Sequence, residues 1–266
     1  MGRGMLVAQE RQTPRATTSE PMRIRAVTCE VLARTVYQQA ALAPHVVDVE
    51  LLEQALHDDR PASRLSRLQG QVDSTDAAKY QAIVLVYGLC NLALEGLQAR
   101  GLPVAVPRAH DCITLYLGSR QRYDAEFSAT PGTFYYSDDY MERQAQVGTN
   151  GRRLTMGVLT SMDQDYDYLV AKFGEDNAQY LLEVLGQWHS HYARAAYVET
   201  GLGKSGPFKD QAAEDARQYS WRFEELKGDP ELVRKLLAAE WDDDFLVLQP
   251  GQRIAVTHDS RIIEAV

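Results

Sequence analysis

Apolar and polar positions alternate along this chain in blocks that predict strands and helices in turn. Residues 83–86 (Ile-Val-Leu-Val) show no polar alternation, which is typical of a strand buried on both faces of a sheet. Three further runs, at 23–28, 45–49 and 103–106, also predict strands. Segments with helix periodicity separate them. This order predicts an α/β fold with a mostly parallel, Rossmann-like sheet and helices on both faces.

Helix periodicity recurs along the chain, and a second group of strands occurs in its second half. A helix with Leu65, Leu68 and Val72 on one face is the clearest case. Further helices are predicted at residues 31–41, 91–100, 111–117, 139–146, 163–173, 176–188, 208–226 and 230–239. Further strands are predicted at residues 132–137, 193–199, 245–248 and 253–257.

The pattern divides the chain into three parts. Residues 1–21 are polar, contain two prolines and have no apolar segment typical of a secretory signal, so we expect a disordered N-terminal arm. Residues 22–130 form an N-terminal α/β half that carries the candidate site. Residues 131–266 form a C-terminal α/β half that completes a cleft, so the halves could be two lobes.

Composition narrows the class of protein. The 266 residues carry a formal net charge of −9, and the densest basic stretch is only the pair Arg152 and Arg153. We therefore expect no nucleic-acid partner. No apolar run approaches the roughly 20 residues that cross a bilayer, so we expect no membrane partner. The expectation is a cytoplasmic protein with a small-molecule substrate. A homodimer is an open alternative.

Each of the three cysteines follows a predicted strand: Cys29, Cys90 and Cys112. Parallel strands end at one edge of an open sheet, where α/β proteins keep their sites, so the three thiols could meet. His57 follows the second strand region and His110 precedes Cys112; a histidine would complete a tetrahedral set. Spacing alone leaves three interpretations open: buried core cysteines, a metal site made of the three cysteines and one histidine, or a thiolate nucleophile.

Two acidic residues flank the predicted ligands. Glu30 and Asp111 could orient a histidine or act as a general base. The alternative is that both are acids at helix N-termini, where they favour the helix dipole.

Two other segments could bind an anion or a cofactor. Arg108 and Ser119 lie in the segment around Cys112, and Gly203 and Lys204 lie in a glycine-rich loop after a predicted strand. That loop is not a P-loop, because Val198 stands where the motif needs glycine. The alternatives are a surface ion pair and an ordinary strand-to-helix turn.

Several short motifs occur in order along the chain. They are Thr28-Cys29-Glu30, Leu56-His57, Tyr87-Gly-Leu-Cys90, Pro107-Arg-Ala-His-Asp-Cys112-Ile, Leu117-Gly-Ser119, Pro131-Gly-Thr-Phe-Tyr135 and Trp241-Asp-Asp-Asp-Phe245. Together they resemble the family called domain of unknown function 1638, over nearly the whole chain after Met22. The chain has Asn91 where the family pattern has glycine, and Asp139-Tyr140 where Gly-Trp is expected. The resemblance implies that the three cysteines, His57 and His110 are motif positions. It implies no particular reaction.

These residues favour a metal-dependent enzyme, either a transferase or a lyase. Thiolate-bound zinc suits methyl or sulfur transfer, because a thiol bound to zinc is deprotonated. One alternative is a [4Fe-4S] enzyme with three cysteine ligands and an open iron. Another is a non-enzymatic metal or cofactor carrier. A metal-free cysteine racemase is the weakest, because no cysteine lies beyond Cys112.

Overall fold

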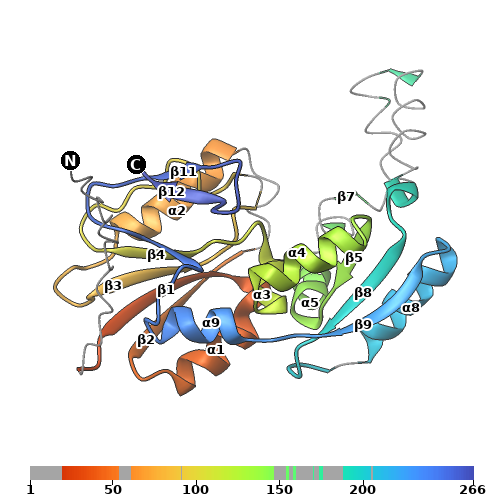
Figure 1. Cartoon of the computed structure of the whole chain (residues 1–266), viewed down its shortest axis with the longest axis horizontal. Coiled ribbons are helices and arrows are strands. Elements are labelled where there is room, and N and C mark those ends of the chain that lie inside the picture. Colours follow the sequence, from red (N-terminus) through yellow and green to blue (C-terminus); the bar gives the residue numbers. More distant parts are fainter. Residues whose placement is uncertain are drawn as a thin grey trace, which may run out of the picture.

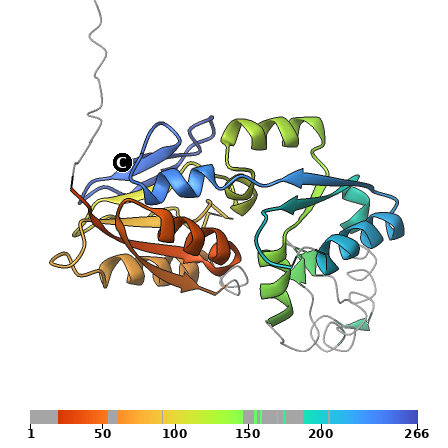
Figure 2. The ribbon, with the colours of Figure 1, turned by 90° about the horizontal axis from the view of Figure 1, so that it is seen from below.

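The computed structural model describes residues 20–53, 61–90, 92–146, 154–155, 158–159, 170, 174–175, 188–204 and 206–266. Within these residues the chain forms two lobes, each built on a sheet of mainly parallel strands (Figures 1 and 2). None of the described helices is long and apolar enough to cross a membrane.

The larger lobe is built on a five-stranded sheet. Its strands are β1 (Arg23–Cys29), β2 (Val46–Leu52), β3 (Ala82–Val86), β4 (Val104–Pro107) and β10 (Phe245–Leu248). The order is β10-β4-β3-β1-β2, and only the edge strand β10 is antiparallel to its neighbour. Every residue of β3 and β4 is buried, which explains their continuous apolar sequence.

Helices cover both faces of this sheet (Figure 1). On one face α1 (Ala33–Leu42), which follows the short 3₁₀ helix η1 (Glu30–Leu32), packs against α9 (Glu231–Leu237). On the other face lie α2 (Pro61–Asp73) and a ribbon of two short strands, β11 (Ile254–Val256) and β12 (Ile263–Ala265). The prediction of an α/β fold with a mostly parallel sheet between helices is confirmed.

The smaller lobe contains a parallel three-stranded sheet. Its strands are β5 (Thr133–Tyr136), β8 (Arg194–Glu199) and β9 (Arg222–Lys227), in the order β5-β8-β9. The other described elements of this part are α5 (Asp138–Gln146), β6 (Leu154–Thr155), β7 (Val158–Leu159), η4 (Trp188–His191) and α8 (Pro207–Gln218). Phe134, Tyr192 and Trp221 pack their rings together near the amino-terminal ends of these strands.

The chain passes between the lobes twice. It leaves the larger lobe through α3 (Cys112–Leu117) and α4 (Arg120–Ala129), and it returns from β9 to α9 (Figure 2). The two passages touch: a Cβ on Gly118 would lie 2.5 Å from the carbonyl oxygen of Asp229, whose N–H donates to Tyr116 at 2.9 Å. Residues 231–266 belong with the first sheet, because α9 packs against α1 and β10 pairs with β4, whereas the sequence-based division placed residues 131–266 in the second half.

Two predicted helices are wrong in whole or in part. Residues 92–96 form turns, with Leu92 and Gly96 at positive φ, and the segment then pairs with the C-terminal region. Gly96 N–H donates to Ile254 at 2.9 Å, and Ala99 N–H donates to Gln252 at 3.0 Å. The helix predicted at 208–226 ends at Gln218, and its last part is β9. The helices predicted at 163–173 and 176–188, like the N-terminal arm, fall almost wholly outside the described residues.

Arg34, at the start of α1, joins the lobes. Its Nη1 donates to Oδ1 of Asp139 at 2.6 Å, its backbone N–H donates to Oδ2 of Asp139 at 3.0 Å, and its Nη2 binds Glu142. A second ion pair links Arg143, also on α5, to Glu30 at 3.7 Å. Helix α5 is therefore fastened to the segment that directly follows β1.

We predict that Arg34→Gln lowers the free energy of unfolding by about 1–3 kcal/mol, because it leaves the buried carboxylate of Asp139 without its counter-ion. The loss stays below that of a fully buried pair, since the Arg34 side chain is 35% exposed. Urea unfolding measures the change. The control is Arg217→Gln, whose pair with Glu214 is exposed on both sides and is worth about 0.5 kcal/mol or less. Equal losses in the two variants would contradict the assignment of Arg34 as a link between lobes.

Candidate functional site

The three cysteines lie at the carboxyl-terminal edge of the larger sheet. In the strand order 2-1-3-4, the chain adds β2 on one side of β1 and then adds β3 and β4 on the other side. The point between β1 and β3 is therefore a topological switch point, where open α/β sheets bind ligands. Cys29 is the last residue of β1, and Cys90 lies in the loop after β3. Cys112 begins α3, in the loop region after β4. The predicted convergence at one sheet edge is therefore what the structure shows for these three residues.

Backbone pairing brings the loops after β3 and β4 together. Leu89 N–H donates to the carbonyl of Ala109 at 2.8 Å, and Cys90 N–H donates to the carbonyl of His110 at 2.9 Å. Gly88 makes this approach possible, because a Cβ there would lie 2.5 Å from the Cα of Asp111. The Tyr-Gly-Leu-Cys and His-Asp-Cys motifs are thus two sides of one contact.

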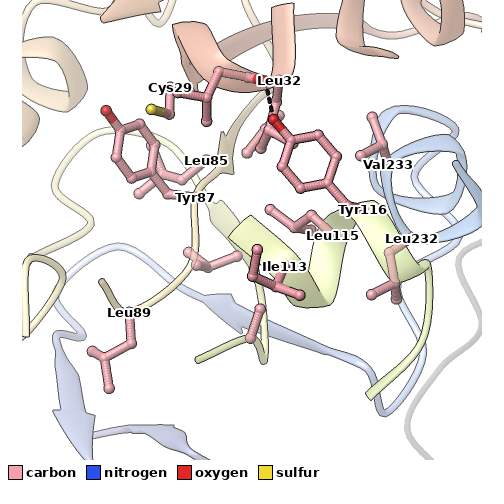
Figure 3. Close-up of a cluster of buried hydrophobic side chains, with 14 of the residues drawn as sticks. Cys29, Leu32, Leu85, Tyr87, Leu89, Ile113, Leu115, Tyr116, Leu232 and Val233 are labelled. Atoms are coloured by element: carbon pink, nitrogen blue, oxygen red, sulfur yellow. Dashed lines mark hydrogen bonds between the residues drawn. The ribbon is translucent and has the colours of Figure 1, made fainter. Parts of the chain in front are cut away.

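The sulfur atoms face polar groups of these same loops. The backbone N–H groups of Gly88 and Cys112 face the sulfur of Cys90, that of Val31 faces the sulfur of Cys29, and each lowers the pKa of the thiol that it faces. Cys29 also contacts the Tyr87 hydroxyl, and Figure 3 shows the two side chains next to each other. All three thiols are close enough to interact electrostatically, and none forms a disulfide.

Burial dominates the acid–base behaviour of the thiols. It raises the pKa of Cys29 to about 11, and it raises the pKa of Cys90 and of Cys112 as well. Mutual repulsion among the cysteines and Asp111 adds to the rise for Cys90 and Cys112. A thiolate form at this site therefore needs a positive partner.

The backbone at Cys90 is in a left-handed conformation that L-residues rarely adopt. Its φ is 41°, and Leu92 two residues later has φ 64°. Such a conformation costs on the order of 1–3 kcal/mol for a non-glycine residue and clusters at functional sites. The turn is held by bonds on both sides: Cys90 N–H to His110, and Ala93 N–H to Leu89 at 2.8 Å.

The two predicted acids have structural partners. Asp111 caps α3, where its Oδ1 accepts from the N–H groups of Ile113 at 2.9 Å and Thr114 at 3.4 Å. Its Oδ2 accepts from the Tyr123 hydroxyl at 3.2 Å, and burial raises its pKa. Glu30 follows Cys29 directly and forms the ion pair with Arg143 between the lobes. Both acids lie beside the thiols in the sequence, and their role as catalytic groups stays a prediction.

Of the two histidines predicted as ligands, His110 belongs to the described part of the chain. His110 is exposed, and its ring lies 5.8 Å from that of Tyr123. His57 lies outside the described residues. Among the described residues, no three His, Cys, Asp or Glu side chains are already arranged as a metal-binding group.

The residues predicted to bind an anion are engaged elsewhere or lie on the smaller lobe. Arg108 Nη1 donates to the carbonyls of Arg261, at 2.9 Å, and Ile263. Ser119 caps α4. Gly203, with φ 102°, lies against Asp138 and Arg34 at the lobe contact, and Lys204 is exposed. These four residues do not form one site.

Sequence reasoning missed two residues beside the cysteines. Arg64 is buried, and its Nη1 donates to the carbonyl of Cys90 at 3.3 Å. Tyr116, on α3, donates to the carbonyl of Val31 and so ties α3 to the turn after Cys29 (Figure 3). Arg64 lies four residues before Leu68 on the same helix, and that spacing was the available signal.

A family model described as "Protein of unknown function (DUF1638)" matches residues 51–237, which is more than half of the chain. The chain belongs to the DUF1638 family. The match includes the loops of Cys90 and Cys112 and the whole smaller lobe, whereas Cys29 precedes it. Neither the curated proteins nor the solved structures contain a match to this DUF1638 chain.

We predict that Gly88→Ala destabilises this DUF1638 protein by at least about 2 kcal/mol, because the new methyl group meets backbone atoms that cannot move aside cheaply. Thermal unfolding monitored by circular dichroism measures the change. Gly70→Ala is the matched control: Gly70 lies inside α2 with open space around it, so alanine there should stabilise by about 0.5–1 kcal/mol. A neutral result at Gly88 would contradict the close loop contact.

Proposed function

We propose that this DUF1638 protein is a metal-dependent enzyme that acts on a small molecule, with zinc held by Cys29, Cys90 and Cys112. The observation that carries the proposal is the convergence of three thiols, none of them in a disulfide, at the point where the strand order reverses. The thiols come from three segments that are far apart in the sequence: the end of β1, the loop after β3 and the start of α3.

The donor set suits a soft metal ion. Thiolates favour zinc and iron–sulfur clusters, and the N–H groups of Val31, Gly88 and Cys112 support negative charge on sulfur. A bound cation would supply positive charge next to these buried thiols and so stabilise their thiolate forms. The described side chains are not yet arranged as ligands, so binding requires the sulfurs to move together. His57 or His110 is the proposed fourth ligand.

The chain's own residues would prepare the site around the ion. The Asp111 carboxylate and the Tyr123 hydroxyl form a hydrogen-bonded pair beside Cys112, which can hold a proton next to a reacting group. Tyr116 fixes the turn after Cys29 through its bond to Val31. Zinc would supply a deprotonated, nucleophilic thiol or a Lewis acid, which suits methyl or sulfur transfer.

A second candidate is a [4Fe-4S] enzyme with one open iron. It is favoured by the number of thiols, since three cysteines leave one iron of such a cluster without a protein thiolate. The N–H groups that face the sulfurs could also donate hydrogen bonds to cluster ligands, and such hydrogen bonds set the reduction potential of an iron–sulfur cluster.

Metal analysis of protein purified without oxygen separates these candidates. We predict about one zinc per chain if the site is a zinc–thiolate centre. A brown protein with visible absorption and about four irons per chain would instead establish the cluster. Protein with neither metal would contradict both forms of the proposal.

Cys90→Ser tests the ligand assignment. The substitution is nearly isosteric, and we predict that it removes most of the metal while the far-ultraviolet circular dichroism spectrum stays unchanged. The matched control is His191→Gln, an exposed residue of the smaller lobe, which should keep the wild-type metal content. Full metal content in folded Cys90→Ser would rule out this site.

A further inference from the structure

Arg64 occupies a position where the pattern of α2 calls for an apolar residue. The buried face of this helix runs through Arg64, Leu68 and Val72, at a spacing of four residues. Leu68 and Val72 pack in the core of the larger lobe. Arg64 takes the first place in the row, and only 6% of its surface is exposed.

The guanidinium of Arg64 has few hydrogen-bond partners among the described residues. Nη1 donates to the carbonyl of Cys90 at a long 3.3 Å, and Nε is buried with no hydrogen-bond partner. No carboxylate of the described residues forms an ion pair with it. The guanidinium of arginine carries a positive charge, so Arg64 places this charge in the interior of the larger lobe. A buried, uncompensated charge is strongly unfavourable, and proteins retain one where a ligand supplies the opposite charge.

The position of Arg64 relates it to the thiols. Strand β2 ends beside β1, with Leu52 in register with Cys29, so the crossover into α2 starts at the edge that carries the cysteines. The bond from Arg64 reaches the carbonyl of Cys90 itself, in the turn with positive φ. A ligand on Arg64 would therefore lie against the loop that carries Cys90.

We infer that Arg64 binds an anionic oxygen group, a carboxylate or a phosphate, of the small molecule that this DUF1638 protein uses at its cysteine site. Because Nη1 is turned to the backbone, the Nε edge of the guanidinium remains, and two parallel N–H groups on that edge match the two oxygens of such a group. The inference rests on the proposed function for the identity of the site, but not for the binding of the anion. It narrows the substrate to an acid.

Thermal unfolding in chloride, acetate and inorganic phosphate, at matched ionic strength, tests the inference. The full-length protein should gain about 2–4 °C in acetate, in phosphate or in both, relative to chloride. The anion that stabilises identifies a carboxylate or a phosphate as the group. Arg64→Met should lose this gain, and Arg64→Lys should keep only part of it, because lysine lacks the fork of N–H groups. Arg217→Met, on the exposed face of α8, is the control and should behave as wild type.

The unfolding temperature in chloride gives a second readout. If the charge of Arg64 has no counter-ion in the ligand-free protein, methionine of similar volume should leave the unfolding temperature unchanged or raise it. A structural arginine would give a clear decrease. That decrease, combined with no response of wild type to either anion, would overturn the inference, and so would an equal anion response in Arg64→Met.

Metal content measured on the same samples separates this inference from the proposed function. Arg64→Met should keep the metal content of wild type, because no metal ligand is changed. An anion response in a protein without metal would support the anion site while the proposed function fails. Metal in the wild-type protein without any anion response would support the proposed function and contradict the anion site.

Discussion

The candidate site depends on the backbone contact between the loops after β3 and β4. Two hydrogen bonds, from Leu89 to Ala109 and from Cys90 to His110, continue the pairing of these strands beyond their ends. Only a glycine at position 88 allows the second loop to lie so close. Once the loops are fixed, the N–H of Cys112 reaches the sulfur of Cys90. The left-handed backbone at Cys90 is the cost of this arrangement, and the same hydrogen bonds maintain it.

The buried thiols and the buried guanidinium respond to their surroundings in opposite ways. Burial raises the pKa of each thiol, so the cysteines remain neutral and pack as small apolar side chains when no cation is present. Arg64 instead carries a positive charge at a buried position. The fold therefore tolerates the cysteine cluster in either state, whereas it carries Arg64 at a cost that a bound anion would offset.

The sequence alone predicts an element correctly where the local pattern of apolar and polar residues determines its structure. The apolar run of β3, the cysteine at the end of β1 and the helix that starts at Asp111 could all be read from short windows. The segment after residue 91 misled the prediction because its apolar residues are buried by pairing with residues 252–254, far along the chain. Arg64 was missed for a related reason: Leu65 seemed to begin the apolar face of α2, although the buried row starts one residue earlier. The pairing cannot be deduced from a short window of sequence, whereas the buried row follows from the four-residue spacing of Arg64, Leu68 and Val72.

The residues that join the two lobes lie close to Cys29 in the sequence. The segment from Cys29 to Arg34 contains η1 and is held at three positions. The carbonyl of Val31 accepts from Tyr116, while Glu30 and Arg34 form ion pairs with α5 of the smaller lobe. The chain returns to the larger lobe at Asp229, which also binds Tyr116. Tyr116 therefore contacts the turn after the first cysteine and the passage between the lobes at the same time. Any change in the angle between the lobes must move Arg34 or break its pair with Asp139. Because only η1 and Ala33 separate Arg34 from Cys29, the position of that thiol depends on how the lobes meet.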